Sequence, residues 1–177
     1  MNQPIINYAD NVHLAVEMVK LGARTQVISS YVKGISYERL LDLYYEVLGR
    51  GAAKGQLPSG VTWYGSWRGL VQSTVFYNIY NKIEIKNEGW RMVKAYRLFL
   101  EYLNKELGAS IHAENVQYLD FNRAWFLLRL IRCGEIEVDV PCTECGLEFI
   151  TIRDKPNSNF VCCLCAPPPR ISKRIKS

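Results

Sequence analysis

Apolar side chains recur every three or four residues along most of the first 133 positions, which is the spacing of helices that bury one face. The segments with this spacing begin near residues 10, 25, 36, 62, 87 and 120. Four of them start at a polar residue that can cap a helix: Asp10, Ser36, Asn87 and Asp120. The last segment stops at Gly134. The pattern therefore predicts a mainly α-helical body.

The segments 25–32 and 36–47 form a pair of short predicted helices joined through a turn at Gly34. This outline is typical of a helix-turn-helix, although any helical hairpin in a core gives the same pattern. If the second helix reads DNA, the side chains that it presents to the groove are Lys33, Ser36, Tyr37 and Arg39. The alternative for Arg39 is an ion pair with Asp42 or Glu46 on its own helix.

Aromatic side chains recur at a spacing of four in the segment 62–82, as Trp63 with Trp67 and Phe76 with Tyr80. Such stripes can stack on nucleic-acid bases, but they belong more often to a core or to an interface between subunits. We therefore expect these four rings to be packed.

The hydrophobic period changes to two near the C-terminus, where residues 135–140 and 147–153 alternate as strands do. Two C-x2-C pairs, separated by sixteen residues, flank the second strand: Cys142, Cys145, Cys162 and Cys165. Two such pairs can hold one ion from two tight turns, and four thiolates complete a tetrahedral zinc site. They also close the coordination shell, so we expect one structural zinc per chain in a small zinc-ribbon-like module with four cysteine ligands.

Other uses of the cysteines fit less well. A thioredoxin-type site needs one pair in a βαβ context, and disulfides need an oxidising compartment, of which the sequence gives no sign. Cys163 competes with Cys162 as a ligand, but the C-x-C spacing that it creates is less common. Cys133, outside the module, is most simply a small buried apolar residue on the last helix.

Charge is unevenly distributed along the 177 residues, whose formal net charge is +5. Residues 1–133 hold sixteen basic against eleven acidic side chains, residues 134–169 two against six, and residues 170–177 four against none. The acidic module is therefore poorly suited to contact DNA. It is better suited to stabilise the fold or to dock another protein. Candidates for phosphate contact lie in the Gly/Pro-rich connection 49–61 and in the tail: Arg50, Lys54, Arg170, Lys173, Arg174 and Lys176. The alternative for the connection is a solvated linker.

Catalysis has little support in the sequence. The two histidines stand far apart, and no nucleophile elbow, P-loop or dinucleotide glycine motif occurs. A zinc-dependent hydrolase is disfavoured because four thiolates leave no open coordination position. We therefore expect that the protein is not an enzyme. No run of eighteen apolar residues occurs, so we expect no membrane contact. No basic leader is found either, so we expect a cytoplasmic protein.

Taken together, these segments resemble the FlhC family of flagellar transcriptional activator subunits. The matching stretches include "SYERLLDLYYEVLG", "NRAWFLLRLIRCGEI" and "CTECGLEFIT" through "FVCCLCAPPPR", and they cover most of residues 14–174 in one order. The chain departs from the family pattern in two places. It ends soon after "RISKRIKS", where longer members continue, and the 104–117 loop looks longer than its counterpart.

The resemblance implies a function that spacing alone does not. FlhC subunits act with FlhD in a heterohexamer of four FlhD and two FlhC chains, which binds promoters of flagellar operons and recruits RNA polymerase. The zinc thiols of the family carry over to the four cysteines of the two C-x2-C pairs, with Cys162 rather than Cys163. We therefore expect a DNA- and partner-binding body over 1–133, a zinc-binding module over 134–169 and a basic tail over 170–177. The rival hypothesis is a zinc-clamped interaction module whose partner supplies the DNA contacts.

Overall fold

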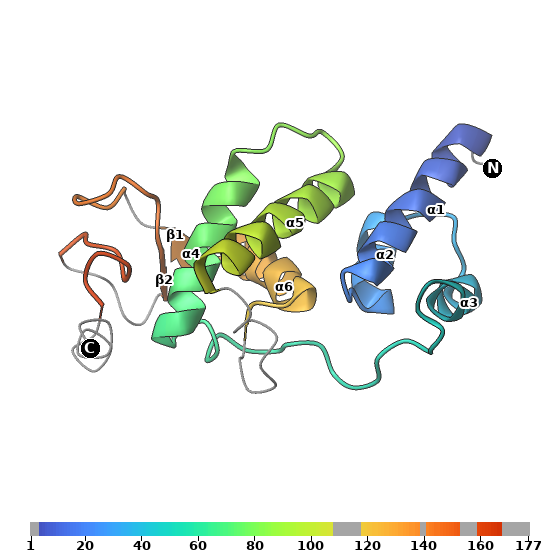
Figure 1. Ribbon diagram of the computed structural model, residues 1–177, viewed down its shortest axis with the longest axis horizontal. Helices are drawn as coiled ribbons and strands as arrows, with labels where there is room; N and C mark the ends of the chain where they lie inside the picture. The colour runs from blue at the N-terminus through green and yellow to red at the C-terminus, as the bar shows by residue number, and fades with distance from the viewer. Residues whose placement is uncertain (1–3, 108–117, 139–140, 153–158, 168–177) are drawn as a thin grey trace.

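A computed structural model of the chain describes residues 4–107, 118–138, 141–152 and 159–167. These residues form six helices followed by a two-stranded antiparallel sheet (Figure 1). The helices are α1 (Ile5–Lys20), α2 (Thr25–Tyr31), α3 (Tyr37–Leu48), α4 (Trp67–Asn81), α5 (Glu88–Leu107) and α6 (Phe121–Arg132). The strands are β1 (Ile136–Val138) and β2 (Ile150–Ile152), with Ile136 opposite Ile152. The predicted mainly α fold is confirmed, and no helix in the described ranges has the length and hydropathy of a membrane span.

Three of the predicted helix starts are confirmed by capping hydrogen bonds. In each, a side-chain oxygen accepts a hydrogen bond from the backbone amide three residues further on, which satisfies a donor that the first turn leaves free. The caps are Ser36 (3.3 Å), Asn87 (3.1 Å) and Asp120 (2.8 Å).

The predicted start at Asp10 is wrong, because α1 begins earlier, at Ile5. Pro4 precedes the helix with φ −54°, which is close to the helical value, and proline has no amide for the first turn to leave unsatisfied. Ile5 and Tyr8 also extend the apolar spacing of Val12 toward the N-terminus. Asp10 therefore lies inside the helix, at an exposed position.

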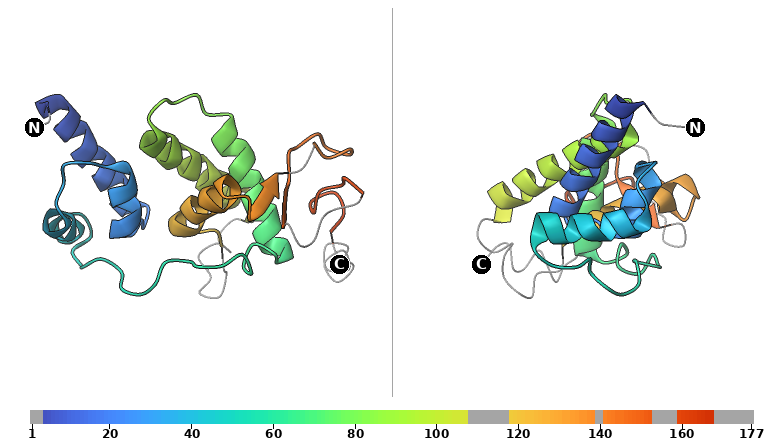
Figure 2. Two further views of the ribbon diagram at one scale, coloured as in Figure 1. Left: turned by 180° about the vertical axis from the view of Figure 1, so that it is seen from behind. Right: turned by 90° about the vertical axis from the view of Figure 1, so that its right-hand side faces the viewer.

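The helices fall into two groups that share one core (Figures 1 and 2). α1, α2 and α3 lie at one end of the molecule, while α4, α5 and α6 lie in the middle, next to the strands. The connection between α3 and α4 runs along one side of the molecule. The fully buried side chains come from both groups and include Met18, Ile28, Phe76, Phe99 and Phe121.

The Phe76/Tyr80 stripe belongs to this core, as predicted. Phe76 on α4 is fully buried and meets the rings of Tyr96 and Phe99 edge-on, with ring centroids 6.4 and 5.8 Å apart. Tyr80 is buried beside it. These rings therefore pack α4 against α5 and are not free to stack on bases.

Polar side chains join the two groups where the core passes between them. Asn122 on α6 accepts a hydrogen bond from the amide of Arg24 (2.8 Å) and donates one to the carbonyl of Gly22 (3.0 Å). Both partners lie between α1 and α2, so one side chain holds this turn against α6. Further along α6, the Trp125 indole donates to the Ser30 hydroxyl at 3.1 Å. Specific hydrogen bonds thus position α1–α3 on the rest of the body.

The small sheet packs against the helical body. Ile136 on β1 and Ile150 on β2 are buried in the same core cluster as the helices. The amide of Ile150 donates a hydrogen bond to the hydroxyl of Thr74 on α4 at 3.2 Å. The strands that flank the first cysteine turn therefore anchor it to the helical body.

Candidate metal centre and nucleic-acid interface

The two C-x2-C pairs meet at the end of the molecule opposite α1–α3 (Figure 1). The four sulfur atoms of Cys142, Cys145, Cys162 and Cys165 lie within 4.8 Å of one another, and the Cys145 and Cys162 sulfurs are 3.7 Å apart. Four sulfurs at about 2.3 Å from a zinc ion form a tetrahedron with edges of about 3.8 Å. The four thiols could therefore hold a metal ion, and the spacing of one pair already matches a tetrahedral edge.

The backbone shapes both cysteine turns in the same way. The amide of Gly146 donates to the carbonyl of Cys142 (2.8 Å), and the amide of Ala166 donates to the carbonyl of Cys162 (3.0 Å). Each bond spans four residues and folds its C-x2-C pair so that the two thiols point to the same side. Gly146 has φ +73°, a left-handed conformation that glycine adopts without strain.

Backbone amides also favour a thiolate at this centre. The amide of Cys162 donates a hydrogen bond to the Cys142 sulfur at 3.2 Å. This bond lowers the pKa of Cys142 to about 6, because it stabilises the charged form. Burial raises the pKa of Cys162. The hydrogen bond thus favours the thiolate form of Cys142, which is the form that binds metal.

Cys163 and Cys133 lie outside this donor set. The Cys163 side chain is half-buried, and burial raises the pKa of its thiol to about 12. The prediction that Cys133 is buried is wrong, because this residue is exposed at the C-terminal cap of α6. α6 ends one residue earlier, and the turn into β1 carries the Cys133 sulfur out of the core, toward the carboxylate of Glu135 at 3.8 Å.

One face of α4 carries the cysteine module. The Trp67 indole donates to the carbonyl of Cys163 (2.9 Å), and the Asn78 amide group donates to the carbonyl of Glu148 (2.6 Å). Thr74, which accepts from β2, lies on the same face, since positions 67, 74 and 78 are separated by seven and four residues. The half-buried Trp67 is thus packed, as predicted, but its polar role was missed. The signal that could have indicated this role is the set of polar residues on the otherwise buried helix α4.

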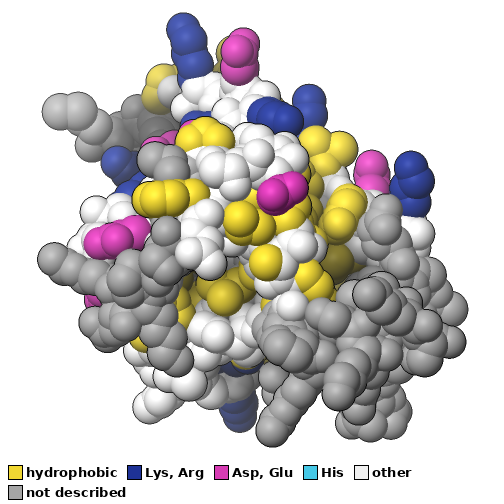
Figure 3. Space-filling view, turned by 90° about the vertical axis from the view of Figure 1, so that its left-hand side faces the viewer, with side chains coloured by type: hydrophobic (Ala, Val, Ile, Leu, Met, Phe, Trp, Pro, Cys, Tyr) yellow, Lys and Arg dark blue, Asp and Glu magenta, His cyan; other side chains and the backbone are white. Residues whose placement is uncertain are grey.

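The end of the molecule that carries the cysteine turns shows an apolar centre. Hydrophobic side chains gather there, while the visible Lys and Arg side chains lie mostly toward the edges (Figure 3). A groove of about 410 Å³ lies between α4 and the second cysteine turn, with Trp67, Leu70 and Val161 among its lining residues. This surface does not suit phosphate.

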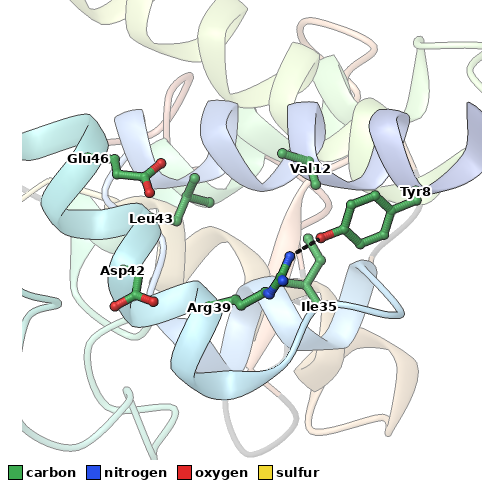
Figure 4. A pocket seen from close by; sticks show the side chains of 7 residues that line it. All are labelled: Tyr8, Val12, Ile35, Arg39, Asp42, Leu43 and Glu46. Atoms are coloured by element: carbon green, nitrogen blue, oxygen red, sulfur yellow. Dashed lines mark hydrogen bonds between the residues drawn. The ribbon is translucent and has the colours of Figure 1, made fainter. Parts of the chain in front are cut away.

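The α2–α3 pair has the predicted exposed residues, but they do not share one surface. Lys33, Ser36, Tyr37 and Arg39 are all exposed. Arg39 turns toward α1, where its Nη1 donates to the Tyr8 hydroxyl at 3.0 Å (Figure 4). Among the described residues it forms no ion pair with Asp42 or Glu46, so the alternative stated for Arg39 is not observed either.

Tyr37 instead borders a groove of about 510 Å³ between the start of α2, the outer face of α3 and the connection after α3. We call it the α2–α3 groove. Its lining includes two cations, Arg24 and Lys54, and contains no Asp or Glu: Arg24, Thr25, Gln26, Tyr37, Leu41, Tyr45 and residues 51–55. Arg24 Nη1 donates to the carbonyls of Gly55 (2.7 Å) and Gln56 (2.6 Å), which holds the connection against the helices.

Some residues of this groove were predicted and others were missed. Lys54 and Tyr37 were candidates from sequence, and the exposed Arg50 lies close by in the chain. Gln26 and Tyr45 were missed, although Tyr37, Leu41 and Tyr45 recur at a spacing of four, which indicates one helix face. The tail candidates Arg170, Lys173, Arg174 and Lys176, and most of the 104–117 loop, lie outside the described residues.

Comparisons with known proteins identify one family. A family model described as "Flagellar transcriptional activator (FlhC)" matches residues 1–177. The flagellar transcriptional regulator FlhC of Cupriavidus metallidurans is 39% identical over 175 residues, which cover 97% of this chain and 78% of the relative. The FlhC of Proteus mirabilis is 37% identical over 176 residues (97% and 86%), and that of Gallionella capsiferriformans 35% identical over 173 residues (96% and 90%).

Proposed function

The chain belongs to the FlhC family of flagellar transcriptional activators, and from this membership we propose that it is the DNA-binding subunit of a flagellar transcription activator. In this role it binds promoters of flagellar operons together with an FlhD-type partner, in the heterohexamer of four FlhD and two FlhC chains implied by the family. The assembly recruits RNA polymerase in the cytoplasm, and the chain itself catalyses no reaction.

The observation that carries the DNA-binding part of the proposal is the α2–α3 groove. Its lining offers Arg24 and Lys54 and no carboxylate, so its electrostatic potential suits phosphate. Tyr37 and Tyr45 are exposed on one wall, where their hydroxyls can donate to phosphate oxygens.

The remaining candidates are proposed as further DNA contacts outside this groove. Lys33 and Ser36 precede α3 and Arg50 follows its end, while Arg39 lies on the α1 side of α3. The tail cations Arg170, Lys173, Arg174 and Lys176 add positive charge after the module. We propose that 1–133 is the DNA- and partner-binding body, 134–169 the zinc-binding module and 170–177 the tail.

The thiol cluster is proposed to hold one structural zinc ion. The four sulfurs within 4.8 Å of one another and the two like-shaped turns fit such an ion. When bound, zinc would cross-link the two cysteine turns. Cys142, Cys145, Cys162 and Cys165 would fill its coordination shell and leave no position for a substrate.

The test is promoter binding by the co-purified complex, measured over a range of salt concentrations. The paired variant Arg50→Ala with Lys54→Ala should weaken promoter and random DNA alike, by about ten-fold at physiological salt. It should also lower the log–log salt slope by about 0.9 for each phosphate that the variant no longer neutralises. A matched control, Lys94→Ala with Lys105→Ala on α5, removes the same charge from exposed positions elsewhere and should keep the wild-type slope.

A complex that does not prefer a flagellar promoter to random DNA contradicts the proposed function. The rival hypothesis, in which the partner supplies the DNA contacts, draws on the apolar face beside the cysteine turns (Figure 3). It predicts that the partner alone binds the promoter as tightly as the complex does, and that the Arg50/Lys54 variant has the wild-type slope.

A further inference from the structure

A second groove lies on the other side of α3, between α3 and α1 (Figure 4). It measures about 340 Å³, and its apolar part is formed by Val12, Ile35 and Leu43. Two carboxylates on α3, Asp42 and Glu46, form one wall, while Arg39 and Tyr8 lie hydrogen-bonded at the other end. We call this the α1–α3 groove. Two carboxylates line this groove, whereas none lines the α2–α3 groove.

We propose that the α1–α3 groove docks an amphipathic helix of the partner subunit, one that presents apolar side chains flanked by a lysine or arginine. This inference rests on the proposed function, because it assigns a place to the partner of that assembly. It goes beyond that function by naming the surface and the chemistry of recognition.

The carboxylates define the charge of the occupant. Asp42 and Glu46 are four residues apart on α3, so they are neighbours on its surface, and like charges at this spacing destabilise a helix. None of the described residues forms an ion pair with either of them. The closest arginine in the groove, Arg39, is directed to the Tyr8 hydroxyl instead. A cationic side chain from a partner would compensate both carboxylates, whereas phosphate would be repelled by them.

The apolar surface of α1 defines the rest of the occupant. Ile5, Tyr8 and Val12 are spaced by three and four residues, so they form one stripe along α1 that extends past the groove. Ile5 is 86% exposed and the adjacent Ile6 74% exposed. Exposed apolar side chains beside a groove between two helices are typical of a surface that receives the apolar face of a third helix.

A second copy of this chain is a poorer occupant. A two-fold contact would bring two identical patches together, and each carries the same pair of carboxylates. The proposal therefore commits to a different protein with basic residues on its docking helix.

The test is capture of the FlhD-type partner by tagged variants that are co-expressed with it. The charge reversal Asp42→Lys with Glu46→Lys should reduce the recovered partner at least about ten-fold, since it replaces attraction by repulsion. The control Glu84→Lys with Glu101→Lys makes the same change in charge at exposed positions outside the groove and should recover the partner within about two-fold of wild type. A second variant, Ile5→Ser with Ile6→Ser, should reduce capture without any change to the core, because both side chains are exposed.

Normal partner recovery by both the reversal and the isoleucine variants overturns the inference, whatever the outcome at the promoter. If the reversal chain misfolds, as judged by its circular dichroism, the isoleucine variant decides. A loss of self-association by the reversal chain with unchanged partner capture also overturns it, because the occupant is then a second copy. If the wild-type chain captures no partner, the proposed assembly itself fails, a result that the wild-type control shows separately.

Discussion

Individual residues decide which cysteines can share a metal ion. A backbone hydrogen bond within each C-x2-C turn helps to direct the four thiols to one centre. The carbonyl of Cys163 accepts a hydrogen bond from the Trp67 indole, and the Cys163 thiol lies outside the set. Two adjacent cysteines in the same turn thus face different surroundings. The sequence left a choice between Cys162 and Cys163 that spacing alone could not settle, because both lie within reach of Cys165.

Replacement of Cys142 should remove the metal. We expect Cys142→Ser in the purified complex to lower bound zinc from one per chain to near zero, as measured by plasma mass spectrometry. Structural zinc sites in small modules contribute about 10–16 kcal/mol of binding energy, so the cysteine turns should also lose protection from hydrogen exchange. Cys163→Ser is the matched control and should keep full zinc. Full zinc in the Cys142 variant would contradict the proposed ligand set.

At the scale of elements, the helix starts near 25, 36, 87 and 120 could be predicted because they depend on short-range chemistry. The start near 62 was predicted too early, because α4 begins at Trp67, after the Ser66 cap. The caps at Ser36, Asn87 and Asp120 are hydrogen bonds between residues three apart, so the local sequence is almost sufficient to predict them. The start of α1 was predicted too late, since Asp10 looks like a cap only if the proline and isoleucine before it are ignored. The direction of Arg39 could not be predicted, because its hydrogen-bond partner, Tyr8, lies 31 residues away on another helix.

The contact between α4 and β2 offers a test with two neighbouring hydroxyls. Thr74 and Ser73 are both fully buried, but only Thr74 accepts a hydrogen bond, from the amide of Ile150. The Ser73 hydroxyl has no hydrogen-bond partner among the described residues. Thr74→Val should lower the free energy of unfolding by about 1–3 kcal/mol, because it leaves a buried amide unpaired. Urea unfolding of the complex measures this loss.

Ser73→Ala provides the control for that measurement. Removal of an unpaired buried hydroxyl should leave the free energy of unfolding unchanged or raise it by about 1 kcal/mol. If both variants lose stability equally, the difference between the two hydroxyls does not exist in solution.

At the scale of the whole molecule, the position of α1–α3 depends on contacts that are distant in the sequence. Asn122 reaches back about a hundred residues to the turn between α1 and α2, and Trp125 reaches back to Ser30. Periodicity showed that these helices are amphipathic, but it gave no information on which helix each one meets. The two grooves on opposite sides of α3 follow from this arrangement, and so neither could be derived from the sequence.

Asn122→Ala should therefore loosen one group of helices from the other. The substitution leaves the Arg24 amide and the Gly22 carbonyl without their partner, so the free energy of unfolding should fall by about 2–3 kcal/mol. Hydrogen exchange in residues 22–28 should rise as well. Asn11→Ala removes a more exposed bond to the Lys33 carbonyl and should cost under about 1 kcal/mol. Equal losses for the two variants would show that Asn122 has no special part in joining the groups.

The burial of β1 and β2 in the core has a consequence for how the protein is made. Ile136 and Ile150 occupy core positions next to helices that were synthesised much earlier. A ribosome releases these strands after all six helices, so the core of the body cannot close while only the helices have emerged. Until the strands follow, the apolar surface that will receive the two isoleucines is open to solvent and to chaperones.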